Sequence, residues 1–311
     1  MKQILSLSLS LLLALSLAAC GGAGAGSSTA HTSGGSSGGS VSSKAGPASH
    51  PTLVLKESGS EERREAGTVL LETEFDKPTV EDPDHEAVRK AIQADLDEIV
   101  ASFQKGSDEI YDLAQSDYQS GGADSVNPHF PYFHNLKVAP ARADSAIFSL
   151  IFDEGSYQGG AHGSDYRYGR SYDAATGRVL KLSDLGNQVP ATVKPIILNM
   201  VKTLHEKEQL FFDDLGEQDL QYVVADDQFY FSKDGLVFLS GEYALQSYAE
   251  GIVSFTISYD ELAGKLKDEY NPGGGVTKCE NATGTYTLRA DGSLDFTERP
   301  EEAEAESDVS S

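Results

Sequence analysis

The sequence contains no tryptophan and only two cysteines, Cys20 and Cys279. So few thiols cannot build a disulfide framework, and stability has to come from a conventional hydrophobic core. Basic residues are also scarce, because 24 Lys and Arg stand against 49 Asp and Glu, giving a formal net charge of −25. Proteins that bind nucleic acid neutralise its phosphates with basic side chains, so the charge argues against nucleic acid as a partner. The same charge permits a cationic or basic protein partner.

Charged residues are absent between Ile4 and Ala19, an apolar run preceded by Lys2. The run is short for a permanent transmembrane helix and has the form of a signal peptide. It ends in the segment LAACG, which resembles the bacterial lipobox, with Cys20 in place to take a diacylglycerol. We therefore expect an extracytoplasmic protein, anchored to a bacterial membrane by a lipid on Cys20. An ordinary secretory signal with a chance cysteine is the alternative.

Large side chains are almost absent from residues 21–50, which are mainly Gly, Ser, Ala and Thr. Such a segment cannot bury enough apolar surface to offset the entropy of ordering, which predicts a flexible tether. Residues 298–308 are rich in Glu and predict a solvent-facing acidic tail. If Cys20 carries a lipid, Cys279 has no partner within the molecule, and we interpret it as a chance free cysteine.

The residues between these ends show the periodicities of regular structure. Apolar residues recur at helical spacing after Asp82-Pro83 and again beyond Pro190, which predicts amphipathic helices over 84–104 and 190–212. The first helix has room to continue past Gly106 to Leu113. Pro195 fits only the first turn of the second helix.

Strands are predicted where apolar and polar residues alternate between turn signals. Val69–Phe75 is expected at a sheet edge, and a capping box of Ser258 and Glu261 is expected to begin a final helix. The other expected strands and hairpins cover 135–138, 146–153, 166–172 with 178–180, 228–232 with 236–239, 252–258, and 286–288 with 294–296.

This pattern predicts an α+β fold of two closely packed lobes, each with a mostly antiparallel sheet and with amphipathic helices covering one face. The expected organisation is a signal peptide with lipobox (1–20), a Gly/Ser tether (21–50), an N-terminal α/β lobe (51–144), a C-terminal domain (145–270), and a Gly-rich linker with a small hairpin and the acidic tail (271–311).

Two stretches resemble a known family. They are Tyr157-Gln158-Gly159-Gly160-Ala161-His162-Gly163, leading to Thr176-Gly177 and Leu182-x-Asp184-Leu185, and Phe229-x-Phe231 through Gly235-Leu236, Tyr243, Tyr248 and Gly251 to Tyr259. Together they are similar to the extracellular domain of RsiV and PdaC, a domain of unknown function numbered 3298. A weaker likeness to the 4163-type domain precedes it.

The resemblance implies a domain outside the cell, attached to a lysozyme-sensing anti-sigma factor, to a peptidoglycan deacetylase, or to a lipid anchor. The last arrangement matches the lipobox of this chain. No region of the sequence resembles a sigma-factor-binding segment or a deacetylase, so neither signalling nor deacetylation follows from the resemblance.

The candidate ligand-binding residues are Tyr157, Gly159, Gly160, His162, Tyr243 and Tyr248. Glycines beside an aromatic ring and an imidazole can present backbone N–H groups to a glycan or peptide, and exposed tyrosines offer a large face with a polar tip. The alternative is structural, with the glycines supplying unusual backbone angles and the rings packing in the core. No metal site, cofactor or catalytic residue is assigned, because ligand-like spacing and a nucleophile elbow are both absent from the sequence.

The resulting hypothesis is a non-enzymatic, lipid-anchored cell-envelope protein that binds cell-wall glycan or a basic wall-degrading protein such as lysozyme. One alternative is a peptidoglycan-acting hydrolase with His162 as acid or base. The other is a structural envelope assembly protein without a small ligand.

Overall fold

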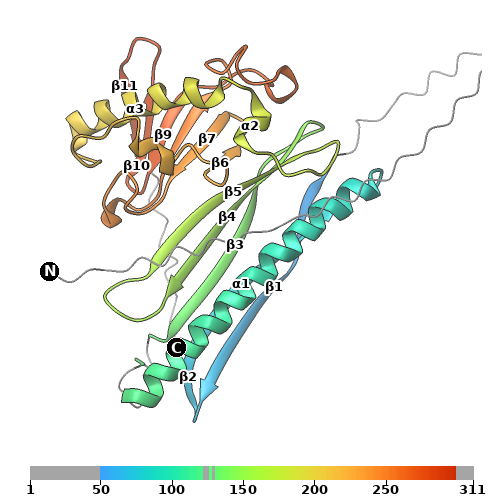
Figure 1. Ribbon diagram of the computed structural model, residues 1–311, viewed down its shortest axis with the longest axis vertical. Helices are drawn as coiled ribbons and strands as arrows, with labels where there is room; N and C mark the ends of the chain where they lie inside the picture. Colours follow the sequence, from blue (N-terminus) through green and yellow to red (C-terminus); the bar gives the residue numbers. More distant parts are fainter. Residues whose placement is uncertain (1–49, 122–125, 128–129, 299–311) are drawn as a thin grey trace, which may run out of the picture. The chain divides into compact units, whose positions relative to one another are not determined.

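The computed structural model describes residues 50–121, 126–127 and 130–298 (Figure 1). Cys20, the predicted signal peptide, nearly all of the predicted tether and the acidic tail beyond residue 298 lie outside this range. Within the described ranges, no helix is both long and apolar enough to cross a membrane.

The first sheet has five strands in the order β1-β2-β3-β4-β5 (Figure 1). Only β2 and β3 are parallel, and α1 connects them. The predicted strand at Val69–Phe75 forms, but it lies between β1 and β3, so its expected place at an edge was wrong. One of the two edge strands, β1, was missed because its charged sequence lacks apolar alternation. The elements are β1 (Thr52–Glu65), β2 (Thr68–Glu81), α1 (Glu86–Gly121), β3 (Tyr132–Ala143), β4 (Ile147–Tyr157) and β5 (Ser164–Asp173).

Helix α1 covers one face of this sheet. Just before it, the Asp82 carboxylate accepts the backbone N–H groups of Asp84 and His85, at 3.3 and 3.2 Å. Its apolar stripe, including Ile92, Leu96 and Phe103, packs against β2, β3 and β4. The helix continues well past residue 104, since Ser107, Ile110 and Ala114 extend the buried stripe.

The second sheet has six strands in the order β11-β10-β9-β8-β7-β6, all antiparallel. Helix α3 packs its buried stripe against this sheet (Figure 1). The elements are α2 (Leu182–Leu185), α3 (Val189–Glu208), η2 (Asp219–Tyr222), β6 (Phe229–Phe231), β7 (Gly235–Ser240), η3 (Tyr248–Glu250), β8 (Val253–Ser258), η4 (Asp268–Tyr270), β9 (Thr277–Asn281), β10 (Gly284–Leu288) and β11 (Leu294–Glu298).

Several local predictions changed in this half. The hairpins β6–β7 and β10–β11 are confirmed, whereas the hairpin expected around Thr176-Gly177 is reduced to one bridge between Tyr172 and Val179. The Ser258–Glu261 capping contacts form, at 3.1 and 3.3 Å, but only turns follow them. Helix α3 ends at 208 because Gln209 adopts φ +57°, and Pro195 lies inside it.

The sheets also extend beyond the expected domain limits. Strands β4 and β5 continue the first sheet to Asp173, past the expected limit at 144, because Phe148 and Leu150 complete the core under α1. Residues 277–298, expected to follow the domain, are strands of the second sheet. Cys279 pairs with Phe255 and is fully buried, and burial raises the pKa of its thiol. The α+β class with mostly antiparallel sheets is confirmed.

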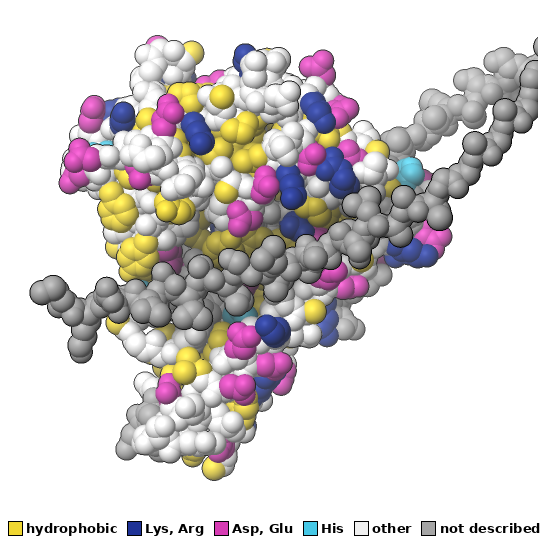
Figure 2. Space-filling view, in the orientation of Figure 1, with side chains coloured by type: hydrophobic (Ala, Val, Ile, Leu, Met, Phe, Trp, Pro, Cys, Tyr) yellow, Lys and Arg dark blue, Asp and Glu magenta, His cyan; other side chains and the backbone are white. Residues whose placement is uncertain are grey.

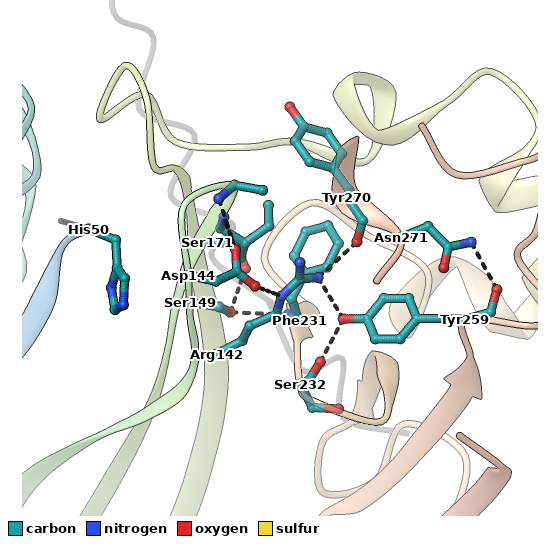
Figure 3. A network of polar contacts seen from close by, with 12 residues as sticks. His50, Arg142, Asp144, Ser149, Ser171, Phe231, Ser232, Tyr259, Tyr270 and Asn271 are labelled. Carbon is teal, nitrogen blue, oxygen red and sulfur yellow. Dashed lines mark hydrogen bonds and ion pairs between the residues drawn. The ribbon is translucent and has the colours of Figure 1, made fainter. Parts of the chain in front are cut away.

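A buried arginine joins the two sheets (Figure 3). Arg142 of β3 donates to Asp144 at 2.7 Å and, across the interface, to the Tyr259 hydroxyl and the Tyr270 carbonyl oxygen, each at 2.8 Å. Its guanidinium also lies over the rings of Phe231 and Tyr259. Nearby, the Phe231 N–H donates to Ser149 Oγ at 3.0 Å.

Close backbone approach at Gly169 of β5 completes the interface. A Cβ atom there would lie 2.1 Å from the Phe229 carbonyl oxygen, which is much closer than van der Waals contact allows. The backbone of a paired strand cannot easily move away to relieve such a clash. We expect Gly169→Ala to lower the free energy of unfolding by about 1–3 kcal/mol or more, as overpacking does. Urea unfolding measures it, with Gly241→Ala as control because a Cβ there meets nothing within 4 Å. Equal stabilities of the two variants would contradict this account of the interface.

Candidate ligand-binding site

The end of β4 and its connection to β5 carry four of the predicted site residues: Tyr157, Gly159, Gly160 and His162. Tyr157 packs among Phe130 and Phe133, with ring centroids 4.9 and 6.1 Å away, and its hydroxyl donates to the Gly160 carbonyl oxygen at 3.0 Å. Gly159 has φ +85°, and a Cβ there would lie 2.5 Å from the Tyr132 hydroxyl. Tyr157 and Gly159 therefore have clear local structural roles, whereas Gly160, at φ +94°, borders open space.

His162, Tyr248 and Tyr243 meet although two separate stretches supply them. The His162 and Tyr248 rings stack with centroids 4.0 Å apart, and Tyr248 stacks on Tyr243 at 5.9 Å. We call these three residues the aromatic stack. Tyr243 is 59 % exposed and holds φ +62°, an unfavourable conformation for a bulky residue. Such strain persists only where surrounding contacts enforce it, and it clusters at functional sites.

A cavity of about 570 Å³ lies over the face of the first sheet that α1 does not cover. The aromatic stack does not line this cavity but adjoins it at Glu242, a lining residue whose charge acts on both His162 and Tyr248. The strand register shows which residues form the floor of the cavity, because directly paired residues project to the same face of a sheet. Asn135 pairs with Gly155, which pairs with Asp165. The connections between strands of the second sheet contribute Glu242, Gly251, Ile252 and Ala282, and the remaining lining residues are Phe133, Lys137, Asp153, Glu154, Tyr166 and Arg167.

The charges in the cavity are only partly balanced. Arg167 forms a two-point ion pair with Asp153, at 2.5 and 3.0 Å. Glu242 accepts the backbone N–H of Asp165 at 3.3 Å, and burial, reinforced by the Asp165 charge, raises the pKa of Glu242. Among the described residues, no Lys or Arg forms an ion pair with Asp165 or Glu242. The cavity therefore offers hydrogen-bond acceptors and uncompensated negative charge.

A chain of Ser107, His134 and Glu154 has the connectivity of a hydrolase triad, but its serine and histidine are buried between α1 and the first sheet. His134 Nδ1 lies 2.8 Å from Ser107 Oγ, and Nε2 lies 2.8 Å from the Glu154 carboxylate. Ser107 is 2 % exposed and donates to the Phe103 carbonyl oxygen at 3.0 Å. A nucleophile must reach its substrate, so this chain holds α1 on the sheet instead.

No three His, Cys, Asp or Glu side chains converge on a metal position in the part of the chain that the structure describes. His129 lies outside that part, and His134 is occupied by Ser107 and Glu154.

The comparison with protein families bears on one segment of the chain. Residues 186–260 match the family model "Protein of unknown function (DUF3298)". The DUF3298 segment runs from α3 to β8 and supplies Glu242, Tyr243 and Tyr248, whereas His162 and the cavity floor lie outside it. No curated protein matches the chain.

The fold resembles solved structures, among them two of the DUF3298 family. One is a DUF3298 family member from Bacteroides fragilis, with a TM-score of 0.52 and 16 % identity over 73 % of this chain and 97 % of that one. The other, from Pseudomonas aeruginosa, has a TM-score of 0.48 and 16 % identity over 72 % and 97 %. The first likeness supports the fold alone. The specific likeness to the extracellular domain of RsiV and PdaC stays a prediction. The likeness of the preceding lobe to the 4163-type domain also stays a prediction.

Several cavity residues were not predicted from the sequence, notably Phe133, Asn135, Asp165 and Glu242. One local signal existed, since Gly155 interrupts an otherwise good strand, and an isolated strand glycine often marks a close approach. Assigning the others requires the register that pairs β3, β4 and β5.

Proposed function

We propose that this protein is a lipid-anchored, extracytoplasmic binding protein, without catalytic activity, whose cavity takes a cell-wall glycan. The observation that carries the proposal is the aromatic stack beside a polar, acidic cavity. Ligand sites typically combine apolar or aromatic walls with a few placed polar groups. The anchoring part rests on the lipobox-like segment around Cys20 and the binding part on the cavity.

Sugar chemistry suits this arrangement. A pyranose ring presents C–H groups that pack on an aromatic face, and its hydroxyl groups donate to carboxylate or amide oxygens. The stack supplies the face, while Asn135, Asp165 and Glu242 supply acceptors from the floor and wall.

A basic wall-degrading protein such as lysozyme is the second candidate, favoured by the net charge of −25. Figure 2 shows acidic and basic side chains interspersed on the viewed face, with hydrophobic surface among them. Binding to lysozyme through bulk charge alone would be lost at physiological salt, where the Debye length is about 8 Å.

The hydrolase and assembly alternatives predict different effects of mutations in the aromatic stack. A hydrolase using His162 would release wall fragments, and His162→Ala would abolish the release. A purely structural protein would lose stability, not binding, when His162 or Tyr248 is truncated.

We expect Tyr248→Ala and His162→Ala to weaken binding of the full-length protein to purified peptidoglycan about 10-fold or more. Truncating an aromatic anchor costs roughly 1–2 kcal/mol or more of binding energy. Cosedimentation at physiological salt measures binding, with thermal melting as the stability check and Tyr222→Ala as the control. Tyr222 is 61 % exposed and belongs neither to the aromatic stack nor to the lining of the cavity.

Three outcomes would decide against the proposal. Absence of peptidoglycan binding by the wild type removes it, and salt-resistant binding to lysozyme alone selects the second candidate. Release of soluble wall fragments selects the hydrolase.

A further inference from the structure

We infer that the site reads an extended glycan chain lying across the strands of the first sheet, and not a single terminal sugar. This inference rests on the proposed function and specifies the form of its ligand. Its basis is a second cavity of about 410 Å³, which shares Phe133 and Asn135 with the first. The two cavities are therefore neighbouring parts of one trough.

Strand register gives the trough its direction. Asp165, Gly155, Asn135, Glu74 and Ser60 form one row of directly paired residues, one from each strand from β5 to β1. Neighbouring strands lie about 4.8 Å apart, so the four steps span roughly 19 Å. The row is longer than one sugar unit, and its direction is perpendicular to the strands.

The middle of the row is open because Gly155 has no side chain. Phe133 flanks it, since its ring would lie 3.8 Å from a Cβ at Gly155. The Glu74 N–H donates to Asn135 Oδ1 at 3.2 Å, which fixes that amide at the junction of the two cavities. The fixed amide and the adjacent ring provide a polar and a stacking contact for a middle unit of the chain.

The far part of the trough is polar and lies over β1 and β2. Ser60, Glu62 and Glu72 line it, and all three are exposed. Hydroxyl-rich units suit such a surface, and each unit placed there adds contacts to those made at the aromatic stack. Affinity therefore has to rise with the number of units in the chain.

The test measures binding of the full-length protein to N-acetylglucosamine oligomers, from the monosaccharide to the hexamer, by calorimetry. For the wild type we expect affinity to rise about 10-fold or more between the dimer and the hexamer. Gly155→Val fills the middle of the trough, and its nearest neighbour, the flexible Asp165 side chain at 3.1 Å, can move. In this variant the hexamer should bind no better than the dimer.

The matched control is Ser156→Val, which adds the same side chain to the adjacent position of β4, on the opposite face. It should keep the wild-type length dependence. Equal affinity of dimer and hexamer for the wild type overturns the extended-chain inference but leaves the proposed function intact. Failure of peptidoglycan and of every oligomer to bind overturns both. Length-dependent binding of oligolysine in place of sugars identifies the occupant as a basic polypeptide and also overturns the inference.

Discussion

Replacing Arg142 with alanine is expected to lower the free energy of unfolding by about 3 kcal/mol or more, because it leaves buried acceptors without their donor and removes packed side-chain atoms. Arg142 is 9 % exposed and bonds to Asp144, Tyr259 and Tyr270 (Figure 3). Its loss leaves the inward-facing oxygens of Tyr259 and Tyr270 without this donor and removes a guanidinium packed between two rings. The sheets should separate more easily, because this side chain contacts both.

Urea unfolding measures the loss, and Arg289→Ala is the control. Arg289 also forms an ion pair, with Asp295, but it is largely exposed, so its replacement should change the free energy of unfolding little. Arg142→Lys retains the charge but cannot reproduce the fork of donors, and it should fall between wild type and Arg142→Ala. Equal stability of the Arg142→Ala and Arg289→Ala proteins would contradict the bridging role.

The difference in unfolding free energy between wild type and Arg142→Ala should also depend on pH, which provides a second measurement. Burial by itself raises the pKa of Asp144, but the hydrogen bond from Arg142 and those from the Ile147 and Ala146 N–H groups lower it overall. A lowered folded-state pKa stabilises the protein above the unfolded value of about 3.9, and this contribution is lost as pH falls through the folded value. The gap between wild type and Arg142→Ala should therefore narrow below about pH 4.

Replacing His134 with alanine is expected to lower the free energy of unfolding by roughly 3 kcal/mol or more, through a cavity and lost hydrogen bonds. His134 is 3 % exposed and links Ser107 of α1 to Glu154 of β4. Its ring stacks on Phe103 with centroids 4.2 Å apart, and Gly106 makes room for it, since a Cβ there would lie 3.2 Å from the ring. Detachment of α1 from the sheet should follow.

His162→Ala is the matched control for this prediction, because it removes the same side chain from an exposed position. It should leave the unfolding midpoint nearly unchanged while weakening glycan binding, and His134→Ala should do the reverse at temperatures where it stays folded. Loss of stability in both variants would mean that the aromatic stack is structural and would count against the binding site.

Elements with a strong local signal were predicted well from the sequence. The stripe of Val88, Ile92 and Leu96 predicted α1, and the turn at Lys233-Asp234-Gly235 predicted the β6–β7 hairpin, because both depend on neighbours in the sequence. Strand β1 was missed, since its pairing with β2 is maintained by backbone hydrogen bonds that charged side chains do not reveal. The limit at residue 144 also differs from the sheet, because β4 pairs with β3 whatever domain its sequence resembles.

The candidate site likewise combines features that the local sequence reveals with contacts that only the tertiary structure decides. The motifs around His162 and Tyr248 were recognisable in the sequence, as were the acidic composition, the lipobox-like segment and the alternation of strands and helices. These features are local, and each follows from residue types and their spacing. Tertiary structure alone stacked His162 on Tyr248, placed Asp165 beside Glu242, and aligned Asn135 with Gly155 on the floor of a trough. Such contacts join residues up to 86 positions apart, and strand register and the docking of one sheet on the other decide them.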